Sequence, residues 1–134
     1  MNRTPLEGAV EQIAKRLGYS FFAAQDDYMS QLVSCYPAAW LAPLKLHEID
    51  GRQHGRISYD LTLHLMCLGT KLTVTQRTQA FADMESQLLS LFAELSLSPT
   101  VIAVTALEIT PRTFAFTTHG ELSQTATARI ITFF

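Results

Sequence analysis

The stretch SYDLTLHLMC, residues 58–67, constrains the fold more than any other part of the chain. Its residues alternate between two faces. One face holds Tyr59, Leu61, Leu63, Leu65 and Cys67, and the other holds Ser58, Asp60, Thr62, His64 and Met66. Because side chains on a strand point alternately to its two sides, this pattern predicts a β-strand with one face on an apolar core. The other face, with Asp60 and His64, is then turned toward solvent or a neighbouring subunit.

The residues before this strand predict a hairpin. Asp50-Gly51 is a strong turn signal, and residues 44–48 form a shorter alternating run. The polar tip GRQHGR joins the two strands. His47, His54 and His64 then lie on the first strand, the tip and the second strand. This scatter, with no paired cysteine or histidine spacing, argues against a metal site.

Two amphipathic helices are predicted. The first opens with Thr4 as cap, Pro5 at the first turn and Glu7 completing a capping box, and Gly18 ends it. Its apolar stripe comprises Leu6, Val10, Ile13, Ala14 and Leu17. The second spans roughly residues 75–95 with Thr75 as cap. Its stripe comprises Phe81, Met84, Leu88, Leu91, Phe92 and Leu95, and Leu89 widens it.

The remaining segments are shorter or more ambiguous. Residues 19–36 contain either a short helix over 26–33 or an irregular connection. Pro37 and Pro43 bracket AAWLA, which favours an edge strand or an approach to one because proline cannot donate to a ladder. Trp40 within it is either a core aromatic or an interface anchor. A strand over 101–110 is expected to end at Pro111, and residues 121–134 form a last strand with apolar residues on both faces.

Together these elements predict an α+β fold in one domain, residues 1–134. The order is helix, (short helix or loop), strand, strand, helix, strand, strand. Two hairpins separated by a helix can merge into a single antiparallel sheet of about four strands, with two helices packed on one face.

Composition narrows the function. The formal net charge is −2 and only 16% of residues are charged, so no basic excess is present to bind nucleic acid. A weakly polar surface can be buried against another subunit at low desolvation cost, which favours oligomerisation. The N-terminus lacks a signal-peptide pattern and no apolar run is long enough to span a bilayer, so a cytoplasmic protein is expected.

Catalytic equipment is not visible in the sequence. Cys35 and Cys67 lack the Cys-x-x-Cys or helix N-terminal setting that lowers a thiol pKa. Neither a Gly-x-Ser-x-Gly elbow nor a Gly-rich phosphate loop occurs. We therefore expect a non-enzymatic protein without a cofactor. The alternative is a small α+β ligand-binding or enzymatic domain with a pocket between the helices and the sheet.

The layout resembles the tail-terminator and head–tail joining proteins of long-tailed bacteriophages and prophages. The matching pieces are PLEGAVEQIAKRL, YPAAWLAPLKL, GRISYDLTLHLM, QRTQAFADMESQLLSLFAEL, VIAVTALEI and TATARIITFF. The segment QDDYMSQ departs from the pattern. The resemblance implies a homo-oligomeric ring, commonly a hexamer, that contacts other tail or connector proteins and forms part of the virion. Contact residues on this hypothesis are Trp40, Arg52, His54, Arg56, Asp60 and His64.

The hairpin tip gives a first test. If Arg52, His54 and Arg56 project from the ring toward a neighbour, the double variant Arg52→Ala/Arg56→Ala loses assembly, because the contact charges are gone. Its melting temperature stays unchanged, because exposed loop charges contribute little to folding. Size-exclusion chromatography with light scattering measures the assembly state, and thermal unfolding measures the melting temperature. Unaltered assembly contradicts the hypothesis.

Overall fold

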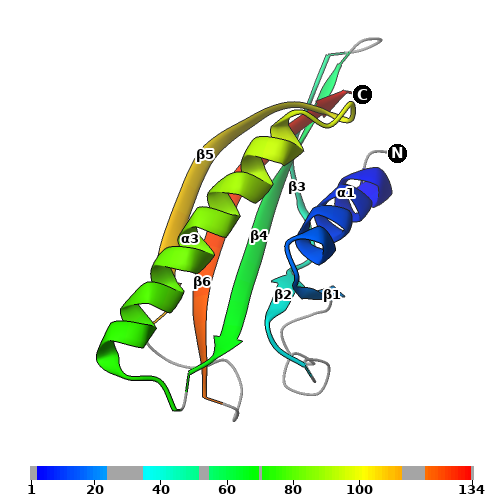
Figure 1. Cartoon of the computed structure of the whole chain (residues 1–134). Coiled ribbons are helices and arrows are strands. Elements are labelled where there is room, and N and C mark those ends of the chain that lie inside the picture. Colours follow the sequence, from blue (N-terminus) through cyan, green and yellow to red (C-terminus); the bar gives the residue numbers. More distant parts are fainter. Residues whose placement is uncertain (1–2, 24–34, 52–54, 70, 113–119, 134) are drawn as a thin grey trace.

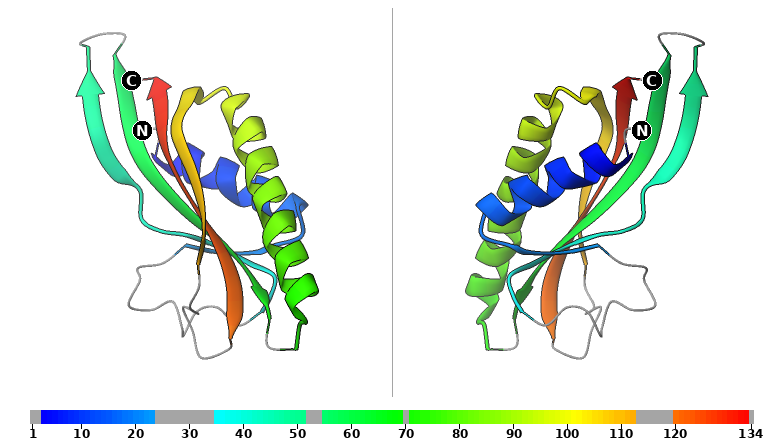
Figure 2. Two further views of the ribbon diagram at one scale, coloured as in Figure 1. Left: turned by 90° about the vertical axis from the view of Figure 1, so that its left-hand side faces the viewer. Right: turned by 90° about the vertical axis from the view of Figure 1, so that its right-hand side faces the viewer.

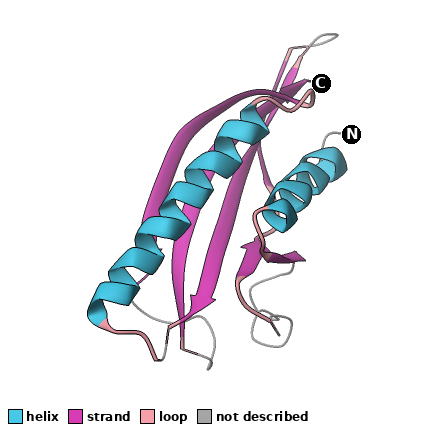
Figure 3. Cartoon of the chain, in the orientation of Figure 1, coloured by secondary structure: helices cyan, strands magenta, loops and turns pink. Residues whose placement is uncertain are grey.

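The computed structural model describes residues 3–23, 35–51, 55–69, 71–112 and 120–133. Two helices lie side by side on one face of a six-stranded sheet, and the other face carries no helix in the described part of the chain (Figures 1 and 3). The elements are α1 Arg3–Arg16, β1 Ser20–Ala23, β2 Ala38–Leu41, β3 Lys45–Asp50, β4 Arg56–Leu68, α3 Val74–Ser96, β5 Val101–Arg112 and β6 Glu121–Phe133. The α+β class and the two helices on one face agree with the prediction.

The sheet is built around β4. The strand order is β1-β2-β4-β6-β5, and β3 also pairs with β4, beyond the end of β2. Strand β4 pairs antiparallel with β6 along its whole 13-residue length. The sheet thus has six strands instead of about four, and it is mixed because β1 and β2 run parallel. Strand β1 has only four residues, too few for an alternating pattern to be recognised in the sequence.

Strand β2 is interior and does not lie at the edge. It pairs with β1 on one side and β4 on the other. Pro37 and Pro43 fall outside Ala38–Leu41, so neither removes a hydrogen bond from the ladder. The prediction of an edge strand was wrong because the prolines delimit the strand instead of lying within it. The short helix considered for residues 26–33 falls outside the described residues.

Helix α1 buries the predicted apolar stripe, with Leu6, Val10, Ile13 and Ala14 in the core. It begins at Arg3, so Thr4 lies inside the helix and is not its cap. Its end is as predicted. Gly18 has φ of 97°, and the Gly18 and Tyr19 N–H groups donate to the carbonyls of Lys15 and Ala14 at 3.0 and 3.1 Å. This pair of bonds is the Schellman arrangement that a left-handed glycine permits.

Helix α3 is capped two residues earlier than predicted. Thr73, and not Thr75, accepts the Gln76 N–H, and the Gln76 side chain accepts the Thr73 N–H in return. The reciprocal capping box fixes the first turn of the helix. Five apolar side chains face the sheet, Met84, Leu88, Leu91, Phe92 and Leu95. Leu89 is 52% exposed, so it does not widen the stripe.

Polar contacts fasten the helices to each other and to the sheet. Arg16 of α1 forms an ion pair with Glu94 of α3, and the Tyr19 hydroxyl donates to Gln87. Arg3 donates to the Leu44 carbonyl at 2.6 Å and lies over the Tyr59 ring at 5.2 Å. None of the described helices is long and apolar enough to cross a bilayer.

The alternation in β4 places its leucines as predicted. Leu61, Leu63 and Leu65 are at most 1% exposed and belong to one core cluster with both helices. Strand β5 differs from the prediction, because it continues through Pro111 to Arg112. It is an edge strand, where a missing donor is tolerated. Ala106 has φ of 53°, at a point where the β5–β6 register shifts.

Neighbouring leucines on α3 test this assignment of the core. Leu88 is fully buried and Leu89 is half exposed, so Leu88→Ala should lower the free energy of unfolding by about 2–5 kcal/mol. Leu89→Ala, the matched control, should change it by about 0.5 kcal/mol or less. Urea unfolding measures both. Equal losses would show that α3 does not present this face to the sheet.

Candidate functional site

The β3–β4 hairpin, here called the arm (residues 45–50 and 56–60), contains the most exposed strand of the sheet, β3. In the side views of Figure 2 the arm curves away from the helices, while residues 56–60 stay paired with β6 in the sheet. All six residues of β3 are exposed. Strand β4 is its pairing partner among the described residues, so the outer edge of β3 carries unpaired backbone groups. An edge of this kind is a template for pairing with another chain.

A bulge determines which way the apolar side chains of the arm point. Leu46 pairs with Tyr59 and Ile49 with Ile57, with a register shift at His47 between them. Without this extra residue, Leu46 and Ile49 would lie on opposite faces, because three positions separate them. With it, both lie on the face of Tyr59 and Ile57, and each remains 52% exposed. The arm therefore presents an apolar pair that its own chain leaves half uncovered.

The tip of the arm is closed by two glycines in contact. Gly51 has φ of 88°, and a Cβ on it would lie 2.7 Å from the Gly55 Cα. A Cβ on Gly55 would lie 2.2 Å from the Asp50 carbonyl oxygen. A side chain at either position would therefore collide with backbone atoms. The antiparallel pairing of Asp50 with Arg56 confirms the predicted hairpin between these strands. Arg52 and His54 lie outside the described residues, and Arg56 is exposed at the base of the tip.

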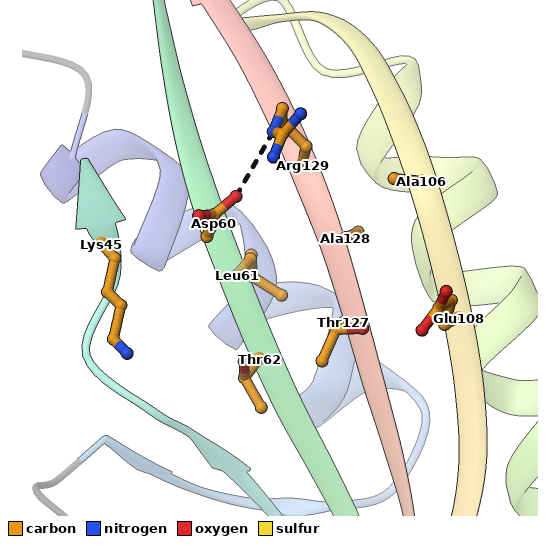
Figure 4. Close-up of a pocket in the computed structure, with 9 residues that line it drawn as sticks. All are labelled: Lys45, Asp60, Leu61, Thr62, Ala106, Glu108, Thr127, Ala128 and Arg129. Atoms are coloured by element: carbon orange, nitrogen blue, oxygen red, sulfur yellow. Dashed lines mark hydrogen bonds and ion pairs between the residues drawn. The ribbon is translucent and has the colours of Figure 1, made fainter. Parts of the chain in front are cut away.

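The second exposed region is the sheet face turned away from α1 and α3, here called the open face. Across its middle the strands place three charged side chains in one cross-strand row, Lys45 on β3, Asp60 on β4 and Arg129 on β6, and the row continues to Thr105 on β5. The fourth charge, Glu108 on β5, lies one step along the strands, opposite Thr127. Together with Thr62 and Thr127 they surround a hollow of about 370 Å³ (Figure 4). Asp60 Oδ1 lies 3.4 Å from Arg129 Nε, and Asp60 Oδ2 lies 3.6 Å from His47 Nδ1. Asp60 is thus partly exposed, at the centre of a charged surface.

The other end of the open face is buried. Trp40 and His64 stack with ring centroids 4.5 Å apart, and Met66 packs beside Trp40. His64 is only 4% exposed and Trp40 only 3%. His64 does lie opposite the leucines, but its predicted exposure to solvent or to a neighbour was wrong. For Trp40 the core interpretation is confirmed over the interface anchor.

Burial controls the chemistry of His64. Its Nδ1 lies 2.7 Å from the Thr125 hydroxyl, which also accepts a hydrogen bond from Arg112 Nε at 3.5 Å. Burial lowers the pKa of His64 to about 4, and the Arg112 guanidinium adds to the shift. At neutral pH the imidazole is therefore uncharged and packed in a cluster. Strand alternation alone could not distinguish this histidine from one on the surface.

The two thiols lie in different surroundings. Burial raises the pKa of the Cys67 thiol, with Asp83 contributing, so little thiolate exists at neutral pH. Cys35 is exposed, and its Sγ lies 3.4 Å from the Ser20 hydroxyl. In the described ranges no three His, Cys, Asp or Glu side chains come together as metal ligands.

Comparison with protein-family models found no match, and neither did a search of curated proteins.

Several surface residues could not be anticipated from the sequence. Leu46 belongs to the predicted alternating run of residues 44–48 and Ile49 lies just beyond it, so only the odd spacing of the two residues hints at the bulge. Lys45 and Glu108 belong to the same surface because their strands, β3 and β5, flank the central pair of β4 and β6. Sequence spacing does not reveal this strand order.

The buried imidazole predicts an acid-sensitive fold. Unfolded His64 binds its proton near pH 6.5 and the folded chain only near pH 4. This contribution to stability is complete above the unfolded pKa and is lost as the pH falls toward the folded one. Between about pH 7.5 and about pH 5.5 the loss is on the order of 1 kcal/mol. Urea unfolding at the two pH values measures it.

The variant His64→Gln should flatten this dependence, while His47→Gln on the exposed β3 should retain it. A dependence of equal size in all three proteins would assign the acid sensitivity to other groups.

Proposed function

We propose that this chain is a non-enzymatic structural subunit that assembles with copies of itself into a ring. The resemblance to phage tail-terminator and head–tail joining proteins supplies the class: a ring, commonly of six, that caps or joins a tail tube in the virion. Other tail or connector proteins are then its further partners. The observation that carries the proposal is the arm, an exposed edge strand with an uncovered apolar pair.

The arm supports association on energetic grounds. Burying a large apolar side chain contributes about 1.5–3 kcal/mol, so covering the exposed halves of Leu46 and Ile49 contributes about 1 kcal/mol each. The backbone edge of β3 adds hydrogen bonds if another strand pairs with it. A closed ring needs two different surfaces in contact, and the exposed edge of β3 at one margin of the sheet can be one of them.

The alternative, a ligand pocket between helices and sheet, has less support. The space between α1, α3 and β4 is filled by the apolar core, including Leu61, Leu63 and Leu88. The hollow on the open face and a smaller one of about 330 Å³ beside α1 and α3 both lie outside that layer. A monomeric protein that binds a small molecule would favour the alternative.

Charging the arm tests the proposal. In Leu46→Lys/Ile49→Lys, two lysines replace the apolar pair, and lysine on an edge strand opposes pairing. We expect the ring to dissociate to smaller species with little change in thermal unfolding, since both positions are already half exposed. Native mass spectrometry and negative-stain microscopy give the subunit number and the ring shape.

The matched control is Leu89→Lys/Leu97→Lys on the helix layer, where the exposed fractions are 52% and 83%. It should leave the assembly intact. A wild-type chain that stays monomeric at micromolar concentration, or an arm variant that still forms the ring, would refute the proposal.

A further inference from the structure

The charges of the open face follow a strict order across the sheet. From one margin to the other, they are positive at Lys45, negative at Asp60, positive at Arg129 and negative at Glu108 (Figure 4). The middle pair is joined within the chain at 3.4 Å. The outer two lie on β3 and β5, three strand spacings or about 14 Å apart, so they cannot pair with each other in one subunit.

We propose that two copies of the chain pack open face to open face about a two-fold axis that runs parallel to β4 and β6 and between them. This rotation exchanges β4 with β6 and β3 with β5. Asp60 then faces Arg129 of the partner subunit. The backbone of Lys45 comes over Thr105 of the partner subunit, and its side chain, which extends toward the level of Thr62, meets Glu108 of the partner subunit one step along the strands. The symmetry forms each contact twice.

The same order of charges opposes the other simple way of stacking these rows. An axis running across the strands along the row would set each strand against its own copy, so that Lys45 meets Lys45 and Asp60 meets Asp60. Like charges in direct apposition repel and suppress that pairing. The alternating charges are complementary to their own copies only when the rotation exchanges the two margins of the sheet. They therefore favour the axis that runs parallel to the strands.

Two further residue pairs on the exposed part of the open face fit this arrangement. Phe133 is 60% exposed and pairs with Arg56 on the neighbouring strand, so the rotation sets Arg56 of one subunit over the partner's Phe133. A guanidinium over an aromatic ring is a favourable contact. At the centre, Thr62 and Thr127 are exchanged, and their hydroxyls can bond across the axis. In Figure 4 the Lys45 side chain extends along the face toward the level of Thr62, where Glu108 lies at the other margin.

This contact goes beyond the proposed ring. Ring closure joins two different surfaces, whereas a two-fold contact joins one surface to itself. The two can therefore fail separately. The test uses the arm variant Leu46→Lys/Ile49→Lys as background, in which the ring contact is removed and a dimer through the open face is expected.

Charge reversal and restoration test the pairing. In that background, either Lys45→Glu or Glu108→Lys alone puts two like charges into each of the two symmetry-related contacts. The dimer dissociation constant should then rise at least about tenfold at low ionic strength. The swap Lys45→Glu/Glu108→Lys recreates opposite pairs between subunits and should restore the original constant. Sedimentation equilibrium measures the constants, and circular dichroism verifies folding.

The control Lys15→Glu on α1, an exposed helix charge paired with Glu11, should leave the constant unchanged. If Lys45→Glu/Glu108→Lys fails to fold, Asp60→Arg/Arg129→Asp replaces it. This exchange keeps the ion pair within the chain and keeps opposite charges facing each other between the subunits. A monomeric background protein, single variants without effect, or a swap no tighter than the single variants would overturn the proposal.

Discussion

The antiparallel pairing of β4 with β6 is the constraint on which the rest of the structure depends. It joins residues 56–68 to residues 121–133, the middle of the chain to its end, and puts two long strands at the centre of the sheet. Every neighbour is aligned by this pair, with β2 and β3 sharing one side of β4 and β5 lying on the far side of β6. Because β4 is longer than β2, its remaining length can pair only with β3, and that length becomes the arm.

The same pairing explains why the two faces of the sheet differ. Directly opposed residues share a face, so the leucines of β4 lie beside Ala126, Ala128 and Ile130 of β6, and the two helices cover them. On the open face, the opposed residues Asp60 and Arg129 form an ion pair, and the opposed threonines Thr62 and Thr127 are polar. Packing a helix over that row would require desolvation of its charges. The charged row thus favours a partner that supplies opposite charges over an apolar cover.

Elements whose structure follows from a single hydrophobic periodicity could be predicted from the sequence. The alternation around Leu61 and Leu63 and the helical stripe around Leu88 identified the main strand, both helices and most of the apolar core. Prediction from the sequence failed where pairing partners decided the outcome. Alternation showed that His64 lies opposite the leucines, but its burial involves contacts with neighbouring strands, among them Trp40 of β2 and Thr125 of β6.

The candidate site shows the same limit. Asp60 was expected on an outward face, and it is partly exposed there, but its setting depends on Arg129 and His47 from two other strands. Glu108 was not singled out, because its strand is recognised by its apolar residues. Leu46 and Ile49 become one surface only through a bulge at His47, which depends on the register of β3 against β4. Sequence spacing determines which face a residue takes on its own strand but does not determine which strands lie beside it.

The two proposed contacts, if both form, restrict the architecture of the assembly. A ring whose subunits also pair across two-fold axes has dihedral symmetry, and each two-fold axis then meets the ring axis at a right angle. Since the inferred two-fold axis runs along β4 and β6, these strands would be radial, with the arm at the inner or the outer end. The lateral neighbours in the ring would then meet through the sheet margins, where β3 presents its unpaired edge. The apolar arm and the charged row would thus act in perpendicular directions, so that neither contact competes with the other.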